Sequence, residues 1–282
     1  MVLPTGLLGI ICALIAAAIW GSGDFSGGQA ARRSTLFQVL ALSSLSGVAI
    51  LLACAIIWHE SFPSTQGLIF AALAGVAGSI GLTVLYHALS QGYTAIVAPV
   101  SAVIGAALPV GFGMLSHGLP ASSRLVGFML AFAGIWLVSQ TALPGGAVSR
   151  RAFLQGCLAG AGFGGFFILI AQTDAATVFT PLVVARSVYF GIALLLLRIN
   201  RQTLPRLTAN PIALLAGVLD ATGNVFYLLA RQFTSLEVAA VLSSLYPAVT
   251  VLLARQLLKE KVTRTQWLGL VVCLAATMLI TV

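Results

Sequence analysis

The sequence predicts an all-α integral membrane protein with ten transmembrane helices, arranged as a 5+5 inverted repeat. Three observations favour this fold class. The 282 residues are 60% hydrophobic and 7% charged, whereas a soluble domain carries about 25% charged residues. The apolar residues form ten long runs with short gaps between them. Features of the first half also recur in the second half.

The first five apolar runs each end at a charged or turn-forming residue. A glycine-rich stretch, residues 21–28, closes the first run, and it lets the helix unwind or lets another helix come close. Pro99 and Pro109 in the fourth run remove backbone donors and can kink it. The expected helices lie near residues 4–27, 36–58, 66–89, 94–115 and 123–142.

The other five runs carry similar signals. Gly156, Gly160 and Gly164 form a ridge suited to close helix contact, and no strand precedes it as a phosphate loop would require. Pro247 in the ninth run can kink that helix. The expected helices lie near residues 153–171, 178–197, 210–230, 235–256 and 265–281.

The two halves align over several helices. In a sequence alignment of the two halves, residues 85–91 match residues 226–232. Residues 123–127 match residues 264–269 with one residue of slippage. Because each half has an odd number of spans, the second half is upside down relative to the first. The predicted repeats are residues 1–146 and 147–282.

Loop charges predict the orientation in the membrane. The net charge is +8, but Lys and Arg stand in the loops rather than on one face, so we expect no nucleic-acid partner. Loops after the odd-numbered helices hold eleven basic residues, and those after the even-numbered helices hold two, Arg124 and Arg231. The positive-inside rule then places both termini outside.

Three motifs resemble the EamA-type proteins of the drug/metabolite transporter superfamily. They are residues 19–25 (IWGSGDF), residues 243–247 (SSLYP) and residues 258–263 (LKEKVT), the last with Lys259 where the family usually has Gly. The resemblance covers the whole chain. It implies a ten-helix carrier that moves small metabolites, amino acids or drugs through a central cavity, often outward and often coupled to protons. The resemblance also implies that both termini are cytoplasmic, whereas the loop charges place them outside. We give more weight to the loop charges.

Ionisable residues inside apolar helices point to a functional cavity, because a charge in the bilayer is costly. Asp220, Asn224, Tyr227 and Arg231 lie on one helical face. The third helix carries its own polar stripe, and we expect a cavity where the two stripes face each other. That stripe consists of Ser79, Thr83, His87 and Ser90.

Two further charges have alternative interpretations. Arg186 needs a counter-ion or an anionic ligand, and it either pairs permanently with Asp220 or faces the cavity. Asp24 either reaches the cavity mouth, or it caps the helix or pairs with Arg32 or Arg33. Aromatic walls suit organic cations or flat apolar ligands. The candidate substrate-binding residues are Trp20, Asp24, Tyr86, His87, Asp220, Asn224, Tyr227 and Tyr246.

The sequence thus predicts a secondary transporter that works by alternating access as a proton-coupled exporter, with Asp220 and Arg186 as proton-coupling or counter-ion residues. The alternative is an importer or exchanger of a zwitterionic or anionic metabolite centred on Arg186. We expect no enzyme activity, cofactor or metal, and a multi-pass location in a bacterial inner membrane. A monomer is sufficient, and a dimer is possible.

Two more distant functions fit the sequence poorly. A channel needs no inverted repeat, and no filter-like loop is visible. An intramembrane metalloprotease needs the pattern HExxH, but the chain's His59-Glu60 is followed by Ser61, Phe62 and Pro63, with no second His at the required position.

Overall fold

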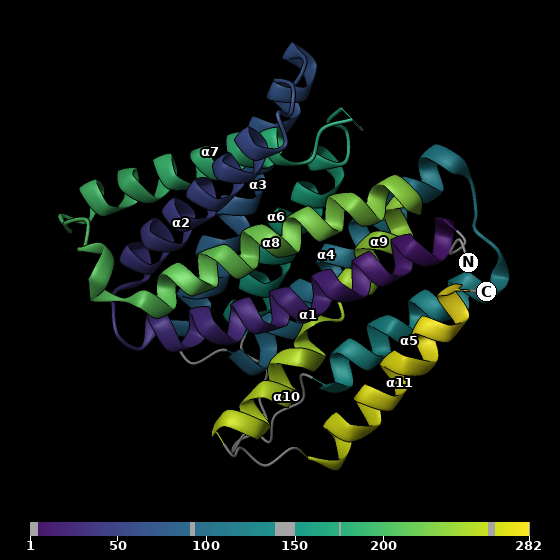
Figure 1. Ribbon diagram of the computed structural model, residues 1–282. Helices are drawn as coiled ribbons and strands as arrows, with labels where there is room; N and C mark the ends of the chain where they lie inside the picture. The colour runs from purple at the N-terminus through teal and green to yellow at the C-terminus, as the bar shows by residue number, and fades with distance from the viewer. Residues whose placement is uncertain (1–4, 91–93, 139–149, 175, 259–262, 282) are drawn as a thin grey trace.

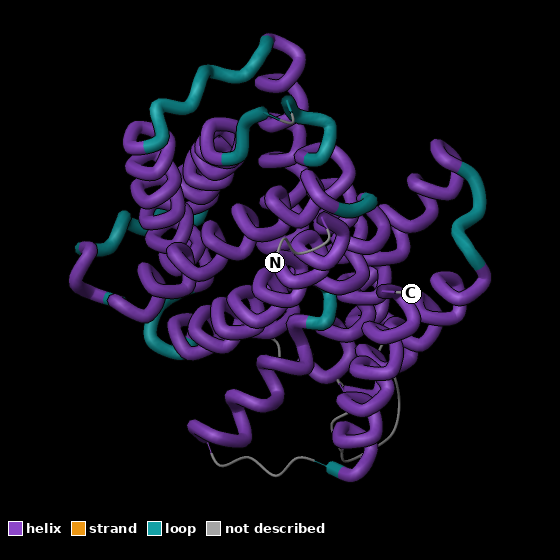
Figure 2. The backbone as a smooth tube through the Cα atoms, turned by 45° about the vertical axis from the view of Figure 1, so that its right-hand side comes forward, coloured by secondary structure: helices purple, strands orange, loops and turns teal. Residues whose placement is uncertain are grey.

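The computed structural model describes residues 5–90, 94–138, 150–174, 176–258 and 263–281. Within these ranges the chain is all-helical and forms no strand (Figure 2). The first half contains α1 (Thr5–Ala31), α2 (Leu36–Ile57), α3 (Thr65–Ser90), α4 (Thr94–His117) and α5 (Ser122–Val138). The second half contains α6 (Arg150–Ile170), α7 (Phe179–Ile199), the short 3-10 helix η1 (Leu207–Ala209), α8 (Pro211–Phe233), α9 (Leu236–Ser243), α10 (Tyr246–Leu258) and α11 (Arg264–Thr281).

Eight helical stretches of the described chain are long and apolar enough to cross a membrane. They carry large apolar side chains on their outer surface, among them Leu52, Ile56 and Leu73, each at least 45% exposed. Such a surface would aggregate in water but matches hydrocarbon. The chain is therefore a multi-pass membrane protein.

Helix α1 continues through the glycine-rich stretch to Ala31, four residues beyond the expected end. The glycines serve close helix approach rather than unwinding. A Cβ atom at Gly21 would lie 2.6 Å from the Tyr246 carbonyl oxygen and from Cβ of Val249. Contact with a neighbouring helix therefore keeps this segment helical.

The ninth expected helix, residues 235–256, is interrupted. α9 ends at Ser243, two turn residues follow, and α10 begins at Tyr246. Pro247 has no N–H to donate to the Ser243 carbonyl oxygen, so one hydrogen bond of the helical ladder is missing at this point. The Ser243 hydroxyl donates to the Ala13 carbonyl oxygen at 3.3 Å, which fixes the break against α1. Pro99 and Pro109 lie within the continuous helix α4.

Helices of the first half pack mainly on helices of the second half (Figure 1). α1 packs on α8, and α6 packs on α3; α6 also packs on α4, and α1 on α9 and α10. α2 packs on α7, and α5 packs on α11. In each of these pairs a helix of the first half thus packs on a helix of the second half.

The glycine ridge of α6 lies against α4, which confirms the helix-contact interpretation. A Cβ atom at Gly156, Gly160 or Gly164 would come within 2.8 Å of Val100, Ile104 or Leu108 in turn. Because these three glycines have no side chains, α6 and α4 can pack closely together.

At one end of the bundle the loop between α2 and α3 joins the loop between α6 and α7. The Glu60 carboxylate, after α2, accepts from the backbone N–H groups of Val178 and Thr180 at 2.6 Å, at the start of α7. Asp174, after α6, accepts from the Ser64 backbone N–H at 2.8 Å, just before α3. Each carboxylate supplies an acceptor to a helix N-terminus, where backbone donors lack partners.

Candidate functional site

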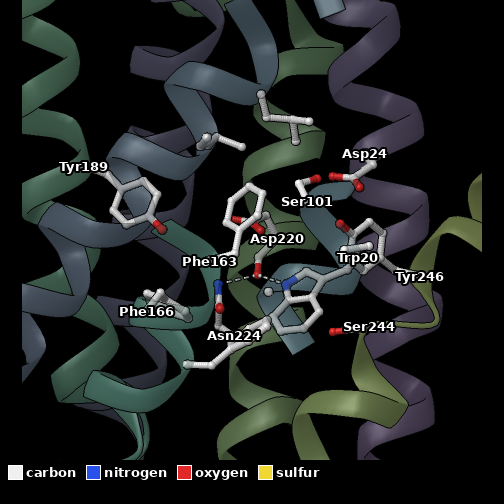
Figure 3. Close-up of a pocket in the computed structure, with 15 residues that line it drawn as sticks. Trp20, Asp24, Ser101, Phe163, Phe166, Tyr189, Asp220, Asn224, Ser244 and Tyr246 are labelled. Carbon is white, nitrogen blue, oxygen red and sulfur yellow. Dashed lines mark hydrogen bonds between the residues drawn. The ribbon is translucent and has the colours of Figure 1, made fainter. Parts of the chain in front are cut away.

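A cavity lies between the helices of both halves (Figure 3). Its walls come from α1, α3, α4, α6, α7 and α8 and from the α9–α10 break. The lining residues are Trp20, Asp24, Leu82, Leu85, Ser101, Ala102, Gly105, Phe163, Phe166, Phe167, Tyr189, Asp220, Asn224, Ser244 and Tyr246. The wall is mainly apolar and aromatic with a few polar groups, as is usual in small-molecule sites.

Trp20 forms an aromatic wall of the cavity. Its indole N–H donates to the backbone carbonyl oxygen of Asp220 at 3.2 Å. The ring packs beside Phe167 and Tyr227, with centroid distances of 5.4 and 6.0 Å. It fits over Gly223, where a Cβ atom would lie 2.5 Å from the indole nitrogen. A glycine in α8 is therefore required to hold this indole against the Asp220 backbone.

Asp220 and Arg186 form a salt bridge between α8 and α7. The Arg186 side chain is 4% exposed and the Asp220 side chain 36% exposed. The guanidinium also lies over the Tyr189 ring, 4.7 Å from its centroid. Of the two charges only Asp220 lines the cavity, so Arg186 is held behind the wall by a carboxylate and an aromatic face.

Asp24 projects from α1 into the same cavity and points toward Ser101 in Figure 3. Over the described ranges of the chain it forms no ion pair, so the expected alternative of a pair with Arg32 or Arg33 is wrong. Its side chain is half-buried. The cavity thus contains one carboxylate with a fixed counter-charge and one without.

Asn224 and Tyr246 complete the polar part of the site. The Asn224 side-chain amide donates to the Asp220 carbonyl oxygen at 2.8 Å, one helical turn earlier. Tyr246 is the first residue of α10, so the interruption at Pro247 brings it and Ser244 to the cavity wall. The broken helix thereby supplies two polar side chains to the site.

Three expected site residues do not line the cavity. Tyr86 packs against α1, where its hydroxyl oxygen would lie 2.7 Å from a Cβ atom at Gly27. His87 is exposed. Tyr227 is fully buried, and its hydroxyl donates to the Phe167 carbonyl oxygen at 3.2 Å. None of the three is among the residues that line the space beside Trp20 and Asp24.

The expected confrontation of two polar stripes is also wrong. The α8 stripe reaches the cavity through Asp220 and Asn224, but α3 contributes Leu82 and Leu85. The Ser79 and Thr83 side chains of α3 instead face a small space between α2 and α7. The reason is that α3 packs on α6 and α7 rather than directly against α8.

Sequence reasoning missed ten of the fifteen residues that line the cavity. The missed residues with rings or hydroxyl groups are Ser101, Phe163, Phe166, Phe167, Tyr189 and Ser244. Tyr189 follows Arg186 by three positions and shares its helical face, which was an available signal. No comparable signal distinguishes the α6 phenylalanines from ordinary apolar residues. The turn at Lys259, which carried part of the family resemblance, lies outside the described residues.

Comparisons with known proteins add a family and a fold. Residues 150–282 match the model of the EamA-like transporter family. One similar solved structure, named only "Crystal structure of protein", has a TM-score of 0.76 and 13% sequence identity, and the match covers 96% of this chain and 95% of that one. At that identity the likeness concerns the fold alone. No curated protein sequence matches the chain.

Proposed function

We propose that this membrane protein is a secondary transporter working by alternating access, because residues 150–282 match the model of the EamA-like transporter family, which is part of the drug/metabolite transporter superfamily. The observation that carries the proposal is one cavity walled by helices of both halves. Movement of one half against the other would open such a cavity to each side in turn.

The inverted 5+5 arrangement is part of the proposal. The corresponding contacts of α1 with α8 and of α6 with α3 support it, as does the self-paired contact of α2 with α7. In this scheme α9 and α10 together form the ninth span, and the break between them is a hinge candidate at the substrate site.

The orientation with external termini is likewise proposed. The loops after α1 and α7 touch each other, since the Thr35 hydroxyl donates to the Gln202 side-chain oxygen at 2.6 Å and the Asn210 amide donates to the Ser34 hydroxyl oxygen at 3.0 Å. The basic residues of these loops therefore share one face of the bundle, and the positive-inside rule assigns that face to the cytoplasm. They are Arg32, Arg33, Arg198, Arg201 and Arg206.

Counterflow in liposomes tests the transport proposal. Purified protein is reconstituted into liposomes loaded with one unlabelled solute, and uptake of the labelled solute is followed. The panel contains three compounds of similar size: benzyltrimethylammonium, phenylalanine and benzylsulfonate. A carrier accelerates uptake when the same solute is inside, whereas a channel does not. Absence of this acceleration for every compound would contradict the proposal.

A blocking variant ties transport to the cavity. Leu82 lines it and is 9% exposed, so Leu82→Trp should fill part of the space and reduce counterflow. Leu73 lies on the same helix but is 47% exposed on the outer surface, so Leu73→Trp is the matched control. Equal rates in the two variants would place the transport path elsewhere.

A further inference from the structure

The cavity carries an excess of negative charge once its ion pair is counted. Asp220 and Arg186 neutralise each other, and the wall contains one further charged residue, Asp24. In the part of the chain described by the structure, no basic side chain pairs with Asp24. The cavity therefore has one carboxylate whose counter-charge must come from the solution or from a ligand.

The same geometry disfavours an anionic ligand. Arg186 is the basic residue nearest to the site, but its side chain is 4% exposed and already has two partners, Asp220 and the Tyr189 ring. An anion would have to displace Asp220 from a buried guanidinium, which leaves that carboxylate without its partner. Binding at Arg186 would therefore replace one ion pair with another and gain little.

Aromatic rings supply the second part of the recognition chemistry. Six aromatic residues line the cavity: Trp20, Phe163, Phe166, Phe167, Tyr189 and Tyr246. Figure 3 labels five of them, all but Phe167, together with Asp24 and Asp220. Ring faces attract organic cations, and the attraction grows where water is excluded. They also bury the apolar body of a ligand. A carboxylate beside several rings is thus a site for a positive group attached to an aromatic or apolar body.

From these observations we propose that the transported substrate is an organic monocation, such as an aromatic or alkyl amine, whose positive group binds Asp24 while Asp220 stays paired with Arg186. This inference rests on the proposed transport function and names the substrate class of the same cavity. It assigns different roles to the two carboxylates. Asp24 recognises the cation, and Asp220 positions α7 against α8.

Equilibrium binding to the purified protein in lipid nanodiscs tests the assignment. The probe is benzyltrimethylammonium, with benzylsulfonate and phenylalanine as the anionic and zwitterionic comparisons. The wild-type protein should bind the cation in preference to both. Preferential binding of either comparison compound, or no binding of the cation, would overturn the proposal. Because this measurement uses only the wild-type protein, misfolding of a variant cannot explain either result.

Variants then locate the charge. Asp24→Asn should weaken binding of the cation by about tenfold or more, because it removes the partner of a desolvated charge. Asp24→Glu keeps the charge and should restore most of the affinity. Asp174→Asn is the matched control, since that carboxylate lies in the loop before α7 and caps α3. Unchanged binding in Asp24→Asn would overturn the role of Asp24.

The outcomes separate the two proposals. Counterflow of phenylalanine or benzylsulfonate but not of the cation would leave the transporter in place and overturn the substrate class. Failure of all three compounds in counterflow, with cation binding that depends on Asp24, would overturn the transport proposal and retain the binding site.

Discussion

Replacement of Asp220 by Asn should destabilise the protein substantially. The change removes the charged partner of Arg186, whose side chain is 4% exposed, and leaves the Tyr189 ring as the other neighbour of the guanidinium. Loss of one partner from a buried ion pair costs about 3–5 kcal/mol. The Asp220 side chain is 36% exposed, so water compensates in part, and we expect the low end, about 3 kcal/mol.

Thermal unfolding in lipid nanodiscs measures this loss. At about 2–4 °C per kcal/mol for a large domain, Tm should fall by about 6–12 °C. The double variant Asp220→Asn with Arg186→Met should recover much of the loss, because removal of both charges leaves no unpaired group. Asp24→Asn is the internal comparison and should not lower Tm, since no ion pair is broken. A Tm for Asp220→Asn within about 2 °C of wild type, or a double variant as unstable as the sum of the single variants, would show that the pair does not stabilise the fold in this way.

Three further changes test the packing and the caps. Gly160→Ala should lower the free energy of unfolding by about 1–3 kcal/mol, and with it Tm, because the new methyl group would lie 2.7 Å from Cβ of Ile104. Gly191 has open space around it, so the control variant Gly191→Ala should leave Tm unchanged or raise it. Glu60→Ala should lower Tm, since two backbone donors at the start of α7 lose their acceptor, and Glu60→Gln should lower it less. Gly223→Ala should displace the Trp20 indole from the Asp220 carbonyl and weaken binding of benzyltrimethylammonium, measured as a dissociation constant.

Helix positions followed from the sequence because a bilayer imposes a minimum length of apolar residues and charges mark the ends. The interruption between α9 and α10 was foreseen only as a kink at Pro247. Proline removes one donor in either case, and the Ser243 contact with α1 decides that the ladder stops altogether. The sequence of a single helix does not predict such contacts with another helix.

The polar residues were found more readily than their roles. Asp220, Asn224 and Asp24 stand out because polar groups are rare in these helices, and all three line the cavity. Which carboxylate is neutralised depends on how α7 and α8 face each other, and the sequence left both possibilities open. Tyr86 and Tyr227 resemble cavity residues in sequence, but helix rotation turns one against Gly27 and buries the other.

The most direct test of cation transport through this cavity is the initial rate of benzyltrimethylammonium counterflow in liposomes containing wild type, Asp24→Asn or Asp174→Asn. Wild type and Asp174→Asn should both show uptake accelerated by internal substrate, and Asp24→Asn should show an initial rate lower by about tenfold or more while retaining the wild-type Tm. Absence of acceleration in wild type, or an equal rate in Asp24→Asn, would contradict the claim that this cavity carries cations across the membrane on Asp24.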